Sequence, residues 1–275
     1  METVKLNNGV EMPVIGLGTF PMNKMPLIKT IRTAVDMGYT AFDTSSAYLN
    51  EKSVGWGIKF ANKKREELFI TTKISNTQQY NSNAREALKD SLKKLKLKYV
   101  DLYLIHWPVP EKYLQTWKEL EALYREGLVR AIGVCNCHQH HLDKLLEVAD
   151  VIPTVNQVEL HPLLAQNELV AFCEKNQIQV EAYSPVARMD KKLVKNPVLL
   201  DIAKRHGKTV VQVILRWNYQ RQIIPIPKSS NPERLKENIS IFDFVLDENE
   251  MAQINALNEN YRVRYDPDNC DFRKL

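Results

Sequence analysis

Short apolar segments alternate with amphipathic helical segments along the chain, and this alternation restricts the possible folds most strongly. Eight apolar runs fit β-strands: Val14–Leu17, Ala41–Phe42, Leu68–Thr72, Val100–Ile105, Val129–Val134, Thr154–Val158, Gln179–Tyr183 and Ile223–Ile226. Their nearly continuous hydrophobicity is typical of parallel strands that are covered on both faces. Between the runs, apolar residues recur at three- and four-residue spacing, as in Ala84, Leu88 and Leu92, which predicts helices.

Eight strands that are each followed by a helix predict an α/β fold, a closed (β/α)8 TIM barrel. Val4–Leu6 and Val10–Met12 flank the turn Asn7-Asn8-Gly9, which predicts an N-terminal β-hairpin. Asp247–Leu257 predicts an extra C-terminal helix, and Ser184–Asn196 a longer loop. No linker or repeat interrupts the 275 residues, so we expect one barrel domain over residues 1–275.

Charge and composition argue against several classes of protein. The net charge is +5, but basic and acidic residues alternate, as in residues 63–67, which indicates solvated helix faces rather than a nucleic-acid surface. No apolar run approaches the ~18 residues of a membrane span, and residues 1–14 contain no signal-peptide core. Four cysteines in a chain of this length do not indicate a disulfide framework. We expect a cytoplasmic monomer with neither nucleic-acid nor membrane partners.

One segment is rich in residues that bind metals. Cys135, Cys137, His138, His140 and His141 fall within seven positions. Zinc sites more often combine one pair of ligands with a second pair from elsewhere in the chain. Here a strand ends near residue 134 and a helix is predicted from about residue 138, so the side chains should point in different directions. We therefore expect no metal site.

Polar residues follow the apolar runs at the positions where strands should end. They are Asp43, Lys73, His106, Asn136, Gln157, Glu159, Tyr183 and Lys228. Each one alone could have a structural role, such as capping a turn or filling the core. Barrel enzymes carry their reactive groups at the C-terminal ends of the strands, so the whole set favours a shared pocket.

Several motifs follow one another in a specific order. They are Gly16-Leu-Gly18-Thr19, Phe42-Asp43-Thr44, Tyr48-Leu-Asn50-Glu51, Lys73, Leu104-Ile-His106-Trp107-Pro108, Asn156-Gln157-Val158-Glu159, Tyr183-Ser184-Pro185 and Ile226-Pro227-Lys228-Ser229 with Arg234, Glu237 and Asn238. Over nearly the whole chain, this series resembles the aldo-keto reductase family, in particular its short microbial members.

The resemblance implies a catalytic tetrad of Asp43, Tyr48, Lys73 and His106, with all four residue types retained. Tyr48 would be the general acid that protonates the substrate oxygen. Because a phenol is a weak acid at neutral pH, the Lys73 ammonium would favour proton release, and Asp43 would hold that lysine. His106, expected to be neutral, would orient the substrate oxygen.

The resemblance also implies NADPH as cofactor, with hydride transfer to small aldehydes, ketones or dicarbonyls. Tyr183 would stack beneath the nicotinamide, Asn136 and Gln157 would bind its carboxamide, and Lys228, Ser229 and Arg234 would surround the 2′-phosphate. The full set of expected cofactor contacts is Gly18, Thr19, Asp43, Asn136, Gln157, Tyr183, Ser184, Lys228, Ser229, Arg234, Glu237 and Asn238. The expected substrate contacts are Phe20, Tyr48, Trp56, His106 and Trp107.

Two positions depart from the family pattern. Cys135 stands where a serine is usual before Asn136, and a thiol is a weaker hydrogen-bond donor. Near the C-terminus, Cys270 replaces an aromatic residue in a tail motif of the short members, which affects the expected pocket wall.

Other functions have weaker support. Tyr48 and Lys52 fit the Tyr-x-x-x-Lys pattern of short-chain dehydrogenases, but that pair belongs far downstream of a glycine-rich loop, and Gly16-Leu-Gly18-Thr19-Phe20-Pro21 lacks the third glycine. The His-x-His of metal-dependent barrel hydrolases is missing from the first strand. A protein that binds cofactor without turnover remains an alternative, although all four tetrad residues are present.

Overall fold

The computed structural model describes residues 1–275 and centres on an eight-stranded parallel sheet. Its strands, in order across the sheet, are β3 (Leu17–Gly18), β4 (Ala41–Asp43), β5 (Phe69–Ile74), β6 (Val100–Ile105), β7 (Val129–Cys135), β8 (Val155–Glu159), β9 (Gln179–Tyr183) and β10 (Ile224–Pro225). Backbone N–H groups of Gly16 and Gly18 donate to the carbonyls of Pro225 and Pro227 at 3.1 and 3.2 Å. These bonds join β3 to β10, so the sheet closes into the predicted barrel.

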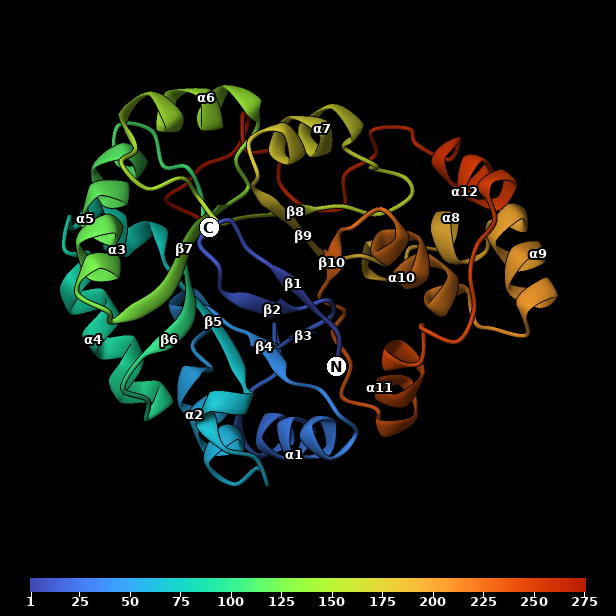
Figure 1. The fold of residues 1–275 in the computed structure, drawn as a ribbon, viewed down its shortest axis with the longest axis horizontal. Helices are drawn as coiled ribbons and strands as arrows, with labels where there is room; N and C mark the ends of the chain where they lie inside the picture. Colours follow the sequence, from blue (N-terminus) through green and yellow to red (C-terminus); the bar gives the residue numbers. More distant parts are fainter.

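Helices form a ring around the barrel (Figure 1). The α-helices are α1 (Lys24–Asp36), α2 (Glu51–Lys59), α3 (Asn76–Tyr80), α4 (Ala84–Leu95), α5 (Tyr113–Arg125), α6 (Gln139–Val148), α7 (Asn167–Lys175), α8 (Lys191–Val194), α9 (Pro197–His206), α10 (Val210–Gln220), α11 (Pro232–Ile239) and α12 (Glu248–Asn255), and the 3₁₀ turns are η1 (Ser46–Tyr48), η2 (Arg65–Glu67) and η3 (Ala187–Met189). None of the helices combines the length and the hydrophobicity that a membrane span requires.

Burial on both faces explains the continuous apolar runs. All six residues of β5 and all six of β6 are buried. The outward side chains of the strands pack against the helices in a core of 51 buried residues, which includes the indole of Trp117 from α5 and that of Trp217 from α10.

The predicted hairpin closes one end of the barrel. Strands β1 (Thr3–Lys5) and β2 (Glu11–Pro13) pair antiparallel, and Figure 1 shows them crossing the barrel. Leu6 and Met12 pack in one cluster with Leu102 and Leu104 of β6. The opposite end, where the strands finish, is therefore left for a ligand.

The element predictions are confirmed for β6 and β9 residue for residue, and the extra C-terminal helix is α12. The first strand lies at Leu17–Gly18 instead of Val14–Leu17, because its register with β4 pairs Leu17 with Phe42. The prediction of a loop over Ser184–Asn196 is wrong in part, since this segment contains η3 and α8. Asp190 starts α8 by accepting a hydrogen bond from the backbone N–H of Lys192 at 2.9 Å.

Candidate active site

The structure brings the four predicted tetrad residues together at the C-terminal end of the barrel. Asp43 ends β4, Lys73 is the penultimate residue of β5, and His106 follows β6 directly. Tyr48 ends η1, whose first turn is held by the Ser45 hydroxyl accepting from the backbone N–H of Ala47 at 3.2 Å. Three strand ends and one short turn thus position the four side chains.

Lys73 and Asp43 form a buried ion pair. The Lys73 ammonium donates to both carboxylate oxygens of Asp43, at 2.7 and 2.6 Å, and to the carbonyl of Thr44 at 2.9 Å. Burial alone would lower the pKa of Lys73, but the charge of Asp43 outweighs burial and raises this pKa above its ordinary value. Lys73 therefore stays a fixed cation inside the barrel.

Tyr48 lies above this cation. The Lys73 Nζ atom is 5.0 Å from the centre of the Tyr48 ring. Burial raises the pKa of Tyr48 to about 12, while the charge of Lys73 acts in the opposite direction. Lysine thus favours proton release, as expected, but the net shift is upward because removal from water penalises a phenolate more.

His106 contacts Tyr48 edge to face, with ring centroids 5.5 Å apart. Burial, together with the charge of Lys73, lowers the pKa of His106 to about 3. The imidazole is therefore neutral near pH 7. Its Nδ1 lies 3.3 Å from the Ser45 hydroxyl, and its backbone carbonyl accepts from the Asn136 side-chain amide at 3.0 Å.

Gln157 links the ion pair to a further acid. Its Nε2 donates to Asp43 at 2.9 Å and to Glu181 at 2.6 Å, so both N–H groups of the side-chain amide are used. The Gln157 Oε1 atom accepts no hydrogen bond from the protein and is the polar atom available to a ligand. Glu181 was not among the predicted site residues, although an acid inside the apolar run of β9 is a signal that could have indicated it.

Asn136 and Tyr183 are held against each other. The Tyr183 hydroxyl donates to the Asn136 side-chain oxygen at 2.7 Å. Asn136 has a left-handed backbone with φ of 60°, and so does Ser184, with φ of 48°. Asparagine tolerates this conformation better than most residues. The backbone bends sharply after β7 and β9, where the resemblance implies a nicotinamide.

Cys135 lies at the end of β7 and is fully buried. Burial raises the pKa of its thiol well above the ordinary value. The thiol is therefore protonated and unreactive near pH 7, and it differs from serine chiefly as a weaker hydrogen-bond donor.

The residues predicted for the 2′-phosphate and adenine gather after β10 and on α11. Lys228 and Arg234 are exposed, and neither forms an ion pair within the protein. Ser229 is buried, and its hydroxyl accepts from the backbone N–H of Asn231 at 3.2 Å. Glu237 and Asn238 lie in the last turn of α11. Two unpaired cations beside a helix start suit an anionic group.

Gly18 and Thr19 have identifiable structural roles at the first strand. A Cβ atom on Gly18 would lie 2.9 Å from the carbonyl oxygen of Ile226, so only glycine allows β3 this close to the chain after β10. The Thr19 hydroxyl donates to the carbonyl of Asp43 at 2.8 Å. These contacts position Asp43, and cofactor contacts of both residues stay a prediction.

Two of the three predicted aromatic side chains lie beside the tetrad. Phe20 lies 5.0 Å from Tyr48 between ring centroids, and Trp107 lies 6.4 Å from His106. Trp56 does not join them. Its ring stacks on Phe60 at 5.2 Å and lies 4.2 Å from the ammonium of Lys96, because that face of α2 points toward the end of α4. The structure therefore does not bring Trp56 together with the tetrad, and its contact with substrate stays a prediction.

The C-terminal segment supplies a wall that the sequence did not reveal. Phe272 packs edge to face on Trp107 at 6.4 Å, and its carbonyl accepts from the Asn76 side chain at 3.0 Å. The buried Glu159 carboxylate anchors this segment by accepting from the backbone N–H groups of Val263 and Arg264, at 2.6 and 3.0 Å. Phe272 thus forms the part of the pocket wall that the sequence left undefined, because Cys270 replaces the aromatic residue usual in the family.

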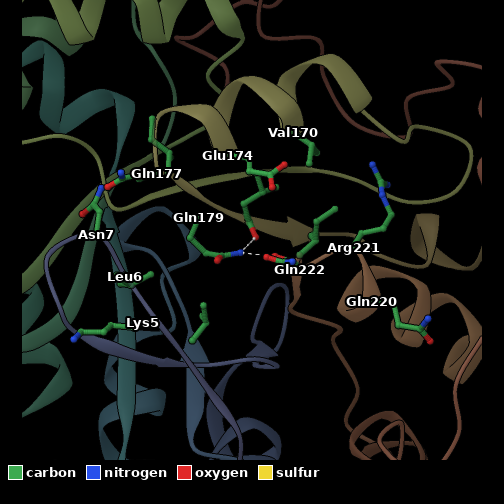
Figure 2. A pocket seen from close by; sticks show the side chains of 14 residues that line it. Lys5, Leu6, Asn7, Val170, Glu174, Gln177, Gln179, Gln220, Arg221 and Gln222 are labelled. Atoms are coloured by element: carbon green, nitrogen blue, oxygen red, sulfur yellow. Dashed lines mark hydrogen bonds between the residues drawn. The ribbon is translucent and has the colours of Figure 1, made fainter.

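A cavity of about 590 Å³ lies at the other end of the barrel, away from the tetrad (Figure 2). Residues of the hairpin, of α7 and of the start of β9 line it, and Gln179 donates to the carbonyl of Gln222 at 2.7 Å. It contains no residue of the predicted site. The polar residues at the strand ends, and not this cavity, therefore identify the site.

Comparison with known proteins agrees with this geometry. Residues 14–259 match the Aldo/keto reductase family. The glyoxal reductase of Bacillus subtilis is 48% identical over 272 residues, which cover 98% of both chains.

Solved structures give the same result for the fold. An aldo-keto reductase from a Medee basin deep-sea metagenome library superimposes with a TM-score of 0.94 at 46% identity, covering 98% of this chain and 99% of that one. A Bombyx mori aldo-keto reductase in complex with NADP gives a TM-score of 0.88 at 35% identity, covering 97% and 95%. The chain therefore belongs to the aldo/keto reductase family of oxidoreductases.

Proposed function

We propose that this protein reduces small aldehydes, ketones and dicarbonyls with NADPH, and that Tyr48 is the general acid. The observation that carries the proposal is the buried Lys73–Asp43 ion pair directly beneath the Tyr48 ring. A fixed cation at this place stabilises the phenolate that remains after Tyr48 has released its proton.

The residues present fit a nicotinamide cofactor. Gln157 presents an unused amide oxygen, and Tyr183 and Asn136 hold each other at the neighbouring strand ends. Lys228 and Arg234 offer two unpaired cations where a 2′-phosphate would be bound. When bound, the cofactor supplies the hydride that adds to the carbonyl carbon.

The chain's own residues would manage the substrate oxygen. His106 is neutral and can donate a hydrogen bond to that oxygen without carrying a charge. Tyr48, with its pKa near 12, is fully protonated at neutral pH and transfers its proton as negative charge develops on the oxygen. Lys73 does not leave its bonds to Asp43 and acts through its charge.

Small dicarbonyls are the favoured substrates. Phe20, Trp107 and Phe272 line the surroundings of Tyr48 with aromatic surface. The relative named glyoxal reductase supports the same class. We further propose that the protein works in the cytoplasm as a monomer, which agrees with four cysteines that are all free thiols.

The first experiment replaces the proposed acid. Tyr48→Phe should lower kcat for glyoxal at least ~100-fold, the effect of losing general-acid catalysis, while NADPH binding measured by fluorescence persists. Tyr265→Phe removes an exposed hydroxyl and serves as control. Near-normal turnover by Tyr48→Phe would exclude Tyr48 as the acid. A wild-type protein that binds NADPH but reduces no carbonyl would support the non-catalytic alternative instead.

The second experiment tests cofactor choice. Arg234→Ala should weaken NADPH binding by about 10-fold and leave NADH binding unchanged, because one charge-assisted hydrogen bond contributes about 1.5–3 kcal/mol and this one is exposed. Lys236→Ala removes an equally exposed cation from the same helix and is the matched control. Equal weakening of both cofactors would show that Arg234 does not contact the phosphate.

A further inference from the structure

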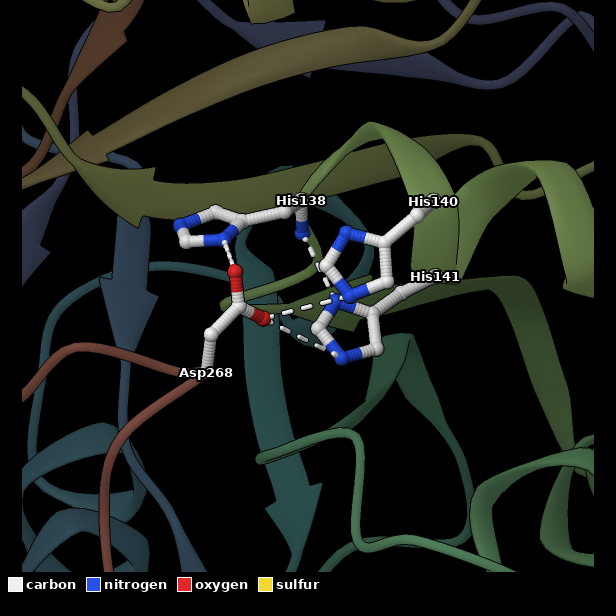
Figure 3. A group of neighbouring side chains, drawn as sticks. All are labelled: His138, His140, His141 and Asp268. Carbon is white, nitrogen blue, oxygen red and sulfur yellow. Dashed lines mark hydrogen bonds and ion pairs between the residues drawn. The ribbon is translucent and has the colours of Figure 1, made fainter.

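Three histidines and one aspartate form a cluster outside the active site (Figure 3). His138 caps α6, and His140 and His141 lie in its first turn. Asp268 belongs to the C-terminal segment, 130 positions beyond His138. One potential ligand atom from each of the four side chains lies within 4.8 Å of the others. We call these residues the His₃Asp cluster.

The spacing within the cluster suits a bound ion. The carboxylate oxygens of Asp268 lie 2.7 Å from His138 Nδ1, 3.2 Å from His140 Nε2 and 3.7 Å from His141 Nε2. A tetrahedral ion with bonds of ~2.0–2.1 Å to nitrogen and oxygen separates its ligands by about 3.3 Å. The contact to His140 is close to that distance, whereas the hydrogen-bonded contact to His138 must open and the contact to His141 must close by a few tenths of an ångström.

Solvent access and side-chain freedom favour the same interpretation. His140 and Asp268 are exposed, whereas His138 and His141 are half-buried, so an ion can enter from one side and meet a partly preformed floor. The His140 and His141 rings lie only 3.9 Å apart between centroids. Imidazole and carboxylate together are the ligand types that zinc and nickel accept in proteins.

Existing hydrogen bonds determine the order of the ligands. Arg262 donates to His138 Nε2 at 2.8 Å, and the backbone N–H of His138 donates to His141 Nδ1 at 3.2 Å. If either ring binds an ion through its other nitrogen, its hydrogen moves and that bond is lost. His140 has no second hydrogen bond to lose. His140 and Asp268 are therefore the primary ligands, and His138 and His141 each join the site at the cost of one hydrogen bond.

We propose that the His₃Asp cluster is a binding site for a divalent transition metal, with zinc as its representative. The sequence-based expectation was no metal, because the candidate ligands then came from one segment and included Cys135 and Cys137. Both thiols are buried in the core and take no part. The missing ligand, Asp268, comes from the distant C-terminal segment.

A metal at this position would act on the pocket wall. Asp268 stands four positions before Phe272, whose ring packs on Trp107 beside His106. An ion shared by α6 and Asp268 would hold this segment against the barrel, in addition to the Glu159 anchor. Hydrogen exchange of residues 266–272 should therefore slow when zinc is bound.

The test is isothermal titration of the tag-free full chain with Zn²⁺ alone. We expect one equivalent to bind, and we expect Asp268→Asn and His140→Ala each to weaken binding ~10-fold or more. Asp271→Asn makes the same charge change in the same segment, and His206→Ala removes a histidine of α9; both should bind as the wild type does. Slower hydrogen exchange of residues 266–272 in the wild type with Zn²⁺ would also support the site.

Three results would overturn the proposal. One is the lack of saturable binding of Zn²⁺ to the wild type. Another is unchanged affinity for Zn²⁺ in Asp268→Asn and His140→Ala. Both side chains are exposed, so both variants should fold and their affinities can be measured. The third is loss of binding in Cys270→Ser, which would assign the metal to the nearby thiol of the same segment.

Discussion

Glu181 is a carboxyl group inside the barrel, joined to Asp43 through the side-chain amide of Gln157. Burial, with a further contribution from the charge of Asp43, raises the pKa of Glu181 to about 8 from an ordinary value of 4.5. The folded protein therefore keeps a proton that the unfolded chain releases. This proton stabilises the fold below about pH 4.5, and the contribution is lost as the pH rises toward 8.

Glu181→Gln tests this linkage, because an amide keeps the acceptor for Gln157 but cannot ionise. Between pH 5 and pH 8, the free energy of unfolding of the wild type should fall by at least about 1.4 kcal/mol more than that of the variant, since one unit of pKa shift has this value. Urea denaturation at both pH values measures the difference. Parallel behaviour of the two proteins would mean that Glu181 does not titrate in this range.

At the residue scale, the sequence predicted which side chains meet but not how their surroundings act on them. Asp43, Lys73 and His106 follow strands, and strand ends of a barrel converge. The upward pKa shift of Tyr48 depends on burial, which no local pattern reports. The packing of Trp56 on Phe60 was not predicted for a related reason, because an aromatic residue in a helix can face either the pocket or a neighbouring part of the chain.

At the scale of elements, helices α2 and α4 approach each other closely at Gly55. A Cβ atom on Gly55 would lie 2.4 Å from the carbonyl oxygen of Leu95, the last residue of α4. Real Cβ atoms do not approach a backbone oxygen so closely, and the backbone of α4 cannot change its rotamer to make room, as a side chain can. Gly55 thus sets the distance between the two helices.

Gly55→Ala should therefore destabilise the protein by about 1–3 kcal/mol, the usual cost of overpacking. Helix propensity alone gives the opposite sign, because alanine is better than glycine in a helix interior by about 1 kcal/mol. Thermal unfolding followed by circular dichroism decides between them, with the exposed Lys52→Ala in α2 as control. A more stable Gly55→Ala variant would show that the helices can separate without loss.

Element predictions succeeded for long buried strands and failed where structure is short. β6 and β9 were predicted residue for residue: all of β6 is buried, and in β9 the three central residues are buried and both ends partly buried. η3 and α8 were missed because four residues do not show a helical period, and only the Asp190 cap marks the start of α8.

On the scale of the whole molecule, the two ends of the chain close the barrel in different ways. The N-terminal hairpin seals the bottom with Leu6 and Met12. The C-terminal segment crosses the top and places Phe272 beside the tetrad. The hairpin could be predicted from its turn residues, whereas the path of the C-terminal segment depends on contacts with residues more than 100 positions away, such as Glu159.

Glu159 offers a way to release that segment without touching the tetrad. In Glu159→Gln, an NH₂ group replaces one of the two oxygens, so one of the backbone N–H groups of Val263 and Arg264 faces another donor. Leaving such a group unpaired costs about 1–3 kcal/mol, which should loosen the segment around Val263 and Arg264. We expect KM for glyoxal to rise several-fold, roughly the effect of 1 kcal/mol, while kcat changes little.

Hydrogen exchange locates the effect, and a second variant serves as control. Hydrogen exchange of residues 262–275 should speed up in Glu159→Gln, while exchange of β5 and β6 stays as in the wild type. Glu259→Gln neutralises an exposed carboxylate that bonds Lys192 and should change neither KM nor exchange. If Glu159→Gln lowers kcat with KM intact, the carboxylate acts on the reacting groups themselves. The anchored C-terminal segment would then not be what shapes the substrate pocket.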